Sequence, residues 1–371
     1  MFGHVVGAAP SRRQVALACS VVGSLVGILL GSFTGVAAGR PVPEARETSV
    51  VWAQPLWWLL PSEPLVGNNA AWAYTYPDYD LNCAPAQTAQ SAIRMIWVEP
   101  DTATHHLLAR SLPWLNEGIR RAASIYGASM RQVFTPTTKY ADHSPRFITR
   151  QAADGSCHAQ FLTVTVPTQV LRLDPEDPGG LVAYLEARGF DRWNRKYYAL
   201  VQAYAPETWA QKGIEGATII NDPDHSQPAD ASNPNNLGGS WSLDYLGNYA
   251  SAWFASPDDN GGFLAYNIAH EIAHSLGAVL PGAPHLRTVP FADGHAADCN
   301  DLMASCDAAN RPARGQFLAC SSQRATMRLD CHRDDYFNPT HPAWEAERWN
   351  IANSSFLWGG GPQPPAATRV R

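Results

Sequence analysis

Residues 263–280 read FLAYNIAHEIAHSLGAVL, and positions 270–274 within them form the pattern His-Glu-x-x-His. Side chains at i and i+4 of an α-helix lie on one face, so His270 and His274 can bind the same metal ion. Glu271 lies beside them and can act as a base toward water at that ion. The pattern predicts a zinc site on a helix. The alternative is a chance pentapeptide whose histidines are merely buried.

The flanking residues predict the helix that this pattern requires. Asp258-Asp259-Asn260 offers an N-cap, and Gly277 follows the second histidine where a helix end is expected. The apolar face consists of Phe263, Leu264, Ile268 and Leu276. We therefore expect one amphipathic helix that carries both histidines and Glu271.

A catalytic zinc ion needs a third protein ligand and an open fourth position. Two histidines farther along the chain, His285 and His295, can supply that ligand, and Asp298 is a weaker candidate. His285 lies in a proline-bracketed loop eleven residues after His274, so it can also reach back. The residues alone leave this choice open.

The sequence resembles the metzincin clan of zinc endopeptidases, and within it a group of secreted actinobacterial reprolysin-like proteases. The resemblance covers about residues 90–358. It is carried by HEIAHSLGAV at 270–279, Pro284-His285, GHAADCNDLM at 294–303, LDCHRDDYFN at 329–338 and WNIANSSFL at 349–357. It implies one catalytic Zn²⁺, with His270, His274 and His295 as ligands and Glu271 as general base. His285 remains the alternative third ligand.

The resemblance also assigns roles to residues outside the ligand set. Met303 would belong to the Met-turn, an apolar floor under the metal, and Tyr336 is a candidate for stabilising the oxyanion. The strand expected at residues 216–220 would pair with an extended substrate. The chain departs from the clan at Leu280, which stands where a third ligand is usual. The positions of Cys299 and Cys306 also differ from those in the group.

The remaining patterns predict strands that alternate with helices around a mixed sheet. The resemblance implies that this is an α+β fold, a metzincin-like catalytic domain with a mixed, twisted sheet and helices. Strands are expected at 93–98, 161–166, 197–204, 216–220 and 249–254, and further helices at 107–126 and 180–188. The domain would span residues 83–361, with an upper part to about Gly277 and a smaller, disulfide-linked irregular part after it. Residues 362–371 would form a tail.

The N-terminal 40 residues predict export. Arg12-Arg13 precedes an apolar run over residues 14–39, which is long enough to span a bilayer as a helix. Val36-Ala37-Ala38 also suits a signal peptidase, so a cleaved signal peptide and a transmembrane anchor both remain open, as do Sec and twin-arginine export. The positive flank predicts a domain that is secreted or anchored on the outer face of the cytoplasmic membrane. Residues 41–82 would be a stalk, pro-segment or extension.

The cysteines and the charge agree with this location. Six of the seven cysteines lie outside the apolar run, which suggests three disulfides, and proximity suggests the pairs Cys83–Cys157, Cys299–Cys306 and Cys320–Cys331. A net charge of −6 without a basic cluster argues against nucleic acid as a partner. The Asp/Asn-rich loop 221–239 lacks the spacing of a calcium site, so Ca²⁺ is unsupported.

These observations predict an exported zinc endopeptidase that acts on proteins or peptides and touches the membrane only through its N-terminal segment. Two alternatives remain: a binding module with this fold and no turnover, and a zinc hydrolase acting on another type of bond.

Overall fold

The computed structural model describes residues 5–8, 81–83, 90–103, 107–131, 143–174, 177, 179–207, 216–221, 232–246, 262–281, 283, 285–286, 294–296, 301–303, 329–330, 335–338 and 349–359. The predicted signal or anchor run at 14–39, nearly all of segment 41–82 and the tail at 362–371 lie outside these residues. Among the residues described, no helix combines the length and the apolar character needed to cross a membrane.

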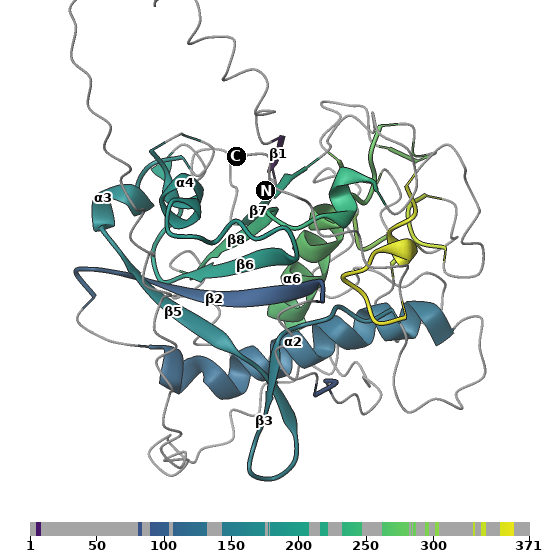
Figure 1. Ribbon diagram of the computed structural model, residues 1–371, viewed down its shortest axis with the longest axis horizontal. Coiled ribbons are helices and arrows are strands. Elements are labelled where there is room, and N and C mark those ends of the chain that lie inside the picture. The colour runs from purple at the N-terminus through teal and green to yellow at the C-terminus, as the bar shows by residue number, and fades with distance from the viewer. Residues whose placement is uncertain are drawn as a thin grey trace, which may run out of the picture.

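A six-stranded mixed sheet forms the centre of the fold (Figure 1). Its strands are β1 (Val5–Ala8), β2 (Ala92–Pro100), β5 (Phe161–Val166), β6 (Arg195–Val201), β7 (Gly216–Ile220) and β8 (Trp241–Tyr245). Their order across the sheet is β1-β7-β8-β6-β2-β5. Strands β5, β2, β6 and β8 are parallel, whereas β7 runs antiparallel to β8 and pairs in parallel with β1. A separate hairpin joins β3 (Thr149–Gln151) to β4 (Cys157–Ala159).

Helices cover both faces of this sheet. Helices α2 (Leu108–Arg131) and α6 (Gly262–Ser275) lie on one face, and the shorter α3 (Thr168–Leu171) and α4 (Leu181–Glu186) lie on the other (Figure 1). Successive side chains of β2 alternate between the two cores: Met95 and Trp97 pack with α2 and α6, while Ile96 and Val98 pack with α4. Burial on both faces explains why β2 is almost continuously apolar.

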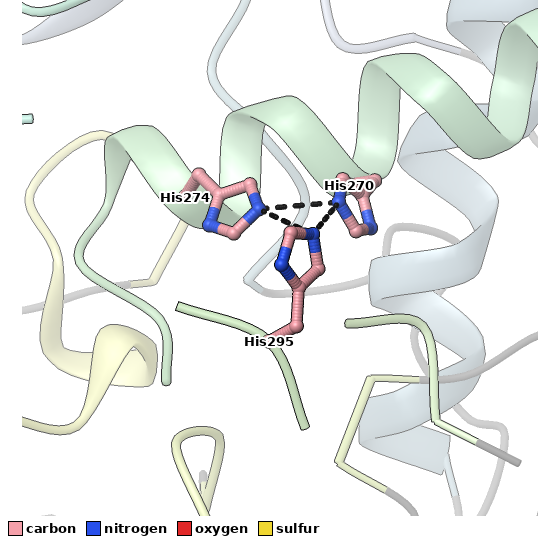
Figure 2. A group of neighbouring side chains, drawn as sticks. All are labelled: His270, His274 and His295. Atoms are coloured by element: carbon pink, nitrogen blue, oxygen red, sulfur yellow. Dashed lines mark hydrogen bonds between the residues drawn. The ribbon is translucent and has the colours of Figure 1, made fainter. Parts of the chain in front are cut away.

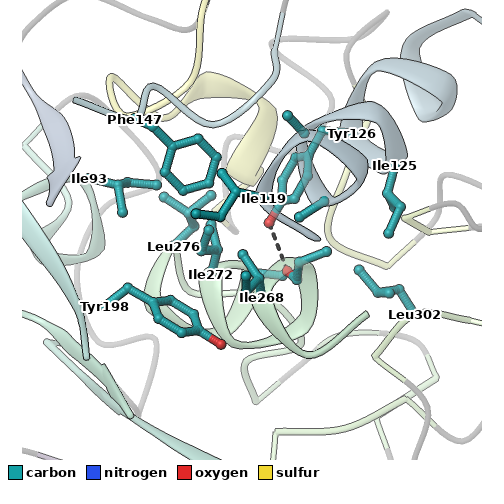
Figure 3. Close-up of a cluster of buried hydrophobic side chains, with 14 of the residues drawn as sticks. Ile93, Ile119, Ile125, Tyr126, Phe147, Tyr198, Ile268, Ile272, Leu276 and Leu302 are labelled. Atoms are coloured by element: carbon teal, nitrogen blue, oxygen red, sulfur yellow. Dashed lines mark hydrogen bonds between the residues drawn. The ribbon is translucent and has the colours of Figure 1, made fainter. Parts of the chain in front are cut away.

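The core between α2 and α6 fixes the helix that carries the metal-binding pattern (Figure 3). Helix α2 presents Leu112, Leu115 and Ile119 at spacings of three and four residues, and each is at least nine-tenths buried. Tyr126, on the same face, donates a hydrogen bond from its hydroxyl to the Ala269 carbonyl of α6 at 3.0 Å. Helix α6 is therefore held against α2 by apolar packing and by this hydrogen bond.

Most of the expected elements are present, with shifted ends. Strands 161–166 and 216–220 have the predicted bounds, and the helix expected at 107–126 continues to Arg131. The strand expected at 197–204 begins at Arg195 and ends at Val201, after which the chain turns and Tyr204 is exposed. The strand expected at 249–254 and the N-cap expected at 258–260 lie outside the described residues.

Strand β7 differs from expectation in its place in the sheet. This strand was expected to pair with an extended substrate, but Val5–Ala8 pairs along its outer side, with Val5 opposite Ala217 and Ala8 opposite Ile220. The pairing joins residues more than 200 positions apart, which no local pattern reveals. In the full chain, β7 is thus an inner strand.

After α6, the described chain consists of turns, isolated bridges and one short 3-10 helix at Ile351–Asn353. This C-terminal part is tied to the rest through polar bonds. The Trp349 indole donates to the Leu276 carbonyl at 2.7 Å, and the Arg146 amide donates to the Phe356 carbonyl at 2.8 Å. The expected irregular character is confirmed for the described residues.

One predicted disulfide is confirmed: Cys83 is bonded to Cys157, which ties the chain before β2 to strand β4. The four cysteines of the other two predicted pairs, Cys299–Cys306 and Cys320–Cys331, lie outside the described residues.

Candidate metal centre

Three histidine side chains converge beside the C-terminal end of α6. His270 and His274 lie one turn apart on the helix, and His295 approaches them from the chain after it (Figure 2). The Nε2–Nε2 distances are 3.1 Å between His270 and His274, 3.2 Å between His270 and His295, and 3.4 Å between His274 and His295. All three side chains are buried, so these nitrogens face each other away from solvent.

This triangle has the geometry of a metal site. A neutral imidazole nitrogen is either a donor or an acceptor, so three nitrogens cannot all pair with one another through hydrogen bonds. A tetrahedral zinc ion with bonds of about 2.0–2.1 Å places its nitrogen ligands about 3.3–3.4 Å apart, close to the observed separations. The group can therefore bind a metal ion, and the set of three imidazoles suits Zn²⁺ among other divalent transition metals.

A turn at residues 301–303 holds two of the three histidines. The Leu302 carbonyl accepts a hydrogen bond from His270 Nδ1 at 2.8 Å. A carbonyl can only accept, so Nδ1 carries the proton and neutral His270 presents its lone pair at Nε2. The Met303 carbonyl accepts from the amide of Ala296, next to His295, at 2.8 Å. Met303 itself is fully buried.

Glu271 is held between α6 and strand β7. Its Oε2 accepts a hydrogen bond from Thr218 Oγ1 at 2.7 Å, and the side chain is buried. A Cβ at Gly216 would lie 3.2 Å from Glu271 Oε1 and would overlap Asp244 Oδ1. Glycine at position 216 therefore leaves room for two carboxylates beside the strand.

His285, the alternative candidate for the third ligand, lies outside the histidine cluster. His285 is turned toward Asp335, whose Oδ1 accepts from both its backbone amide and its Nδ1 at 3.0 Å, and its side chain is 46% exposed. It does not belong to the histidine cluster, whereas His295 does. Asp298 lies outside the described residues. Leu280 is buried in the core and contributes no ligand atom.

Two buried carboxylates, Asp301 and Asp330, and the buried Tyr336 lie at and behind the turn that contacts His270. Burial, with a contribution from the neighbouring Asp330 carboxylate, raises the pKa of Asp301 to about 8. Burial also raises the pKa of Asp330. Tyr336 is buried and its hydroxyl donates to Asp301 Oδ1 at 2.7 Å. The Tyr336 hydroxyl already donates its proton to a protein carboxylate, which disfavours its expected role in stabilising an oxyanion.

Gly277 ends the site helix and cannot be replaced without strain. Its φ is +89°, and a Cβ there would lie 2.7–2.9 Å from the side chain of Asn235. We expect Gly277→Ala to lower the free energy of unfolding by about 1–2 kcal/mol for the backbone conformation and a further 1–3 kcal/mol for the overlap. Gly189→Ala is the matched control, because Gly189 has φ +92° but nothing within 4 Å. Equal losses in chemical denaturation would contradict the role of the overlap.

Lys196 lies under the same end of α6. Its Nζ donates to the Ser275 carbonyl at 2.6 Å and to Ser240 Oγ at 2.9 Å, and the residue is buried. Burial lowers the pKa of Lys196 to about 7, well below its usual value of 10.5. The ammonium is therefore less favourable in the folded protein than in the unfolded chain.

This shift predicts a pH-dependent stability. Between about pH 7 and pH 10.5 the unfolded chain binds more protons at Lys196 than the folded protein, so the free energy of unfolding should rise with pH. The slope from this residue reaches at most about 1.4 kcal/mol per pH unit. Urea denaturation across this range, for the wild type and Lys196→Met, isolates it. Parallel pH profiles for the two proteins would refute the prediction.

Some residues of this arrangement have no role in the sequence-based prediction. Thr218 is the one polar side chain in the strand GATII. A hydroxyl in an otherwise apolar strand indicates that a buried polar group lies nearby, and here that group is the Glu271 carboxylate. The Leu302 carbonyl leaves no trace in a sequence, because any residue offers that acceptor. Asp301 and Asp330 lie in two of the segments that carry the resemblance, 294–303 and 329–338. Their roles as hydrogen-bond acceptors for backbone amides are visible only in the structure.

The chain shows only distant similarity to known proteins. No known family matches the chain, and no curated protein matches it. Among solved structures, it is similar to OgpA from Akkermansia muciniphila, at 14% sequence identity and a TM-score of 0.29. That similarity covers 54% of this chain and 52% of OgpA, so the chain spans about half of that structure. At this level the similarity defines neither a family nor an activity.

Proposed function

We propose that this protein is an exported zinc-dependent endopeptidase. The observation that carries the proposal is the convergence of the Nε2 atoms of His270, His274 and His295 beside a carboxylate, Glu271, on the same helix. Three imidazoles plus one open position form the ligand set of many zinc hydrolases. The resemblance of residues 263–358 to metzincin proteases supports peptide bonds as the target.

The histidines, Glu271 and Thr218 would have different roles in the reaction. The three histidines would hold the ion, which supplies a Lewis acid for the scissile carbonyl and a more acidic water. Glu271 would accept the proton of the attacking water at its carboxylate and pass it to the leaving amine. Thr218 would hold the carboxylate through its bond to Oε2, so that Glu271 keeps one orientation during both transfers.

Export is part of the proposal. The basic pair Arg12-Arg13 and the apolar run behind it favour delivery across the cytoplasmic membrane. The Cys83–Cys157 disulfide fits an oxidising compartment.

The test is cleavage of a diverse peptide library by the purified full chain, with and without added Zn²⁺ and a chelator. Cuts within peptides that depend on Zn²⁺ are expected, and their sequences would give the subsite preferences. A folded, zinc-loaded protein that cuts no peptide would refute the endopeptidase. An ester or amide panel in the same assay would then separate a hydrolase of another bond from a non-catalytic binding module.

A further inference from the structure

The turn at residues 301–303 supports the histidine site from outside helix α6. It contacts His270 through the Leu302 carbonyl and the backbone beside His295 through the Met303 carbonyl. All three turn residues are buried. A displacement of this turn would therefore move or rotate two of the three imidazoles.

Asp301 shapes this turn from within. Its Oδ1 accepts a hydrogen bond from the Met303 amide at 2.6 Å and a second from the Tyr336 hydroxyl at 2.7 Å. The first bond closes the turn, and the second joins it to a segment 35 residues farther along the chain. One carboxylate oxygen thus links the local turn to the C-terminal part of the fold.

Tyr336 is itself held on two sides. Its hydroxyl accepts from the Asp330 amide at 3.0 Å while it donates to Asp301. Asp330 Oδ2 accepts from three successive backbone amides, those of residues 335, 336 and 337, at 2.8–3.0 Å. The segment is also anchored to α2, because the Leu329 amide donates to Ser129 Oγ at 2.7 Å. The tyrosine ring therefore approaches the turn from a rigid support.

We propose that Tyr336 and Asp301 are positioning residues that hold the turn 301–303 against the histidine cluster and so set its affinity for the metal ion. The inference rests on the proposed metal site but not on peptide cleavage. Neither side chain belongs to the histidine cluster, so their effect passes through the Leu302 and Met303 carbonyls. Partners one step removed from a metal ligand usually change metal affinity by about 10–100-fold.

The experiment measures Zn²⁺ affinity of the metal-free full chain by competition with a chromophoric chelator. Tyr336→Phe removes only the hydroxyl and is expected to weaken Zn²⁺ binding by about tenfold, the lower end of the range for a direct partner of a ligand, because it acts through the turn. Tyr126→Phe is the matched control, since Tyr126 is also fully buried and loses a hydroxyl that donates to a backbone carbonyl of α6. That control should stay within about threefold of the wild type, because the turn is untouched.

The second pair of variants tests the same link at Asp301. Asp301→Asn keeps an Oδ1 acceptor and should bind Zn²⁺ nearly as the wild type does, whereas Asp301→Ala should match Tyr336→Phe. Thermal unfolding of each metal-free variant shows whether it is folded at the temperature of the titration. If Tyr336→Phe is not folded, the contrast between Asn and Ala at position 301 decides.

Equal affinities for Tyr336→Phe and Tyr126→Phe, or for the two Asp301 variants, would overturn the inference. A wild-type chain that binds Zn²⁺ but cleaves no peptide would refute only the endopeptidase, because the affinity contrasts can still be measured.

Discussion

Glu271→Ala is expected to leave Zn²⁺ binding intact and to lower kcat/KM for peptide cleavage by about 10²–10⁴-fold. The carboxylate is not one of the three converging ligands, so its removal leaves the Nε2 atoms of His270, His274 and His295 in place. What would be lost is the group that we propose to accept and return a proton. The effect should fall on kcat more than on KM, because proton transfer is realised in the transition state.

The measurement is steady-state cleavage of the best peptide from the library, with Zn²⁺ content determined on the same samples. Glu117→Ala is the matched control: Glu117 lies on α2, partly exposed, and contacts only surface arginines among the ion pairs described for it. Its activity should equal that of the wild type. Wild-type turnover by Glu271→Ala would show that the base is another group.

His295→Ala is expected to weaken Zn²⁺ binding more than about 100-fold, because loss of a ligand exceeds the 10–100-fold cost of losing a ligand's partner. Its Nε2 completes the triangle with His270 and His274, and among the described residues no other side chain belongs to this cluster. Activity at limiting Zn²⁺ should fall with the affinity.

His285→Ala provides the internal comparison in the same titration. The His285 ring points to Asp335, and its backbone amide keeps a bond to the same oxygen after the substitution. We expect Zn²⁺ affinity within about threefold of the wild type. A large loss in His285→Ala with little change in His295→Ala would reverse the assignment of the third ligand.

The contrast between these two histidines shows where sequence reasoning ends. The pair His270 and His274 could be predicted because helical spacing alone places them on one face. The third position depends on which loop folds back, and both His285 and His295 are within reach along the chain. The structure separates them through contacts with Asp335 and with the turn 301–303, neither of which follows from spacing.

In the fold, too, local features could be predicted from the sequence and long-range pairings could not. Strands β5 and β7 have the predicted bounds because their apolar patterns begin and end sharply. The end of β6 was predicted too late, since the aromatic Tyr204 continues an apolar pattern that the backbone does not follow. The pairing of β1 with β7, like the bond from Tyr336 to Asp301, joins residues far apart in sequence, and no periodicity records it.

The pairing of β1 with β7 requires both strands to lie on the same side of a membrane. It precedes the apolar run at residues 14–39, whereas its partner β7 follows that run. Two strands can exchange hydrogen bonds only within one compartment, so a chain threaded through a bilayer by that run, with residues 5–8 inside and β7 outside, must give up this pairing. Cleavage of a leader has the same effect. Translocation would then turn β7 from an inner strand into one that has lost its outer neighbour, with its backbone groups on that side able to pair with another extended chain.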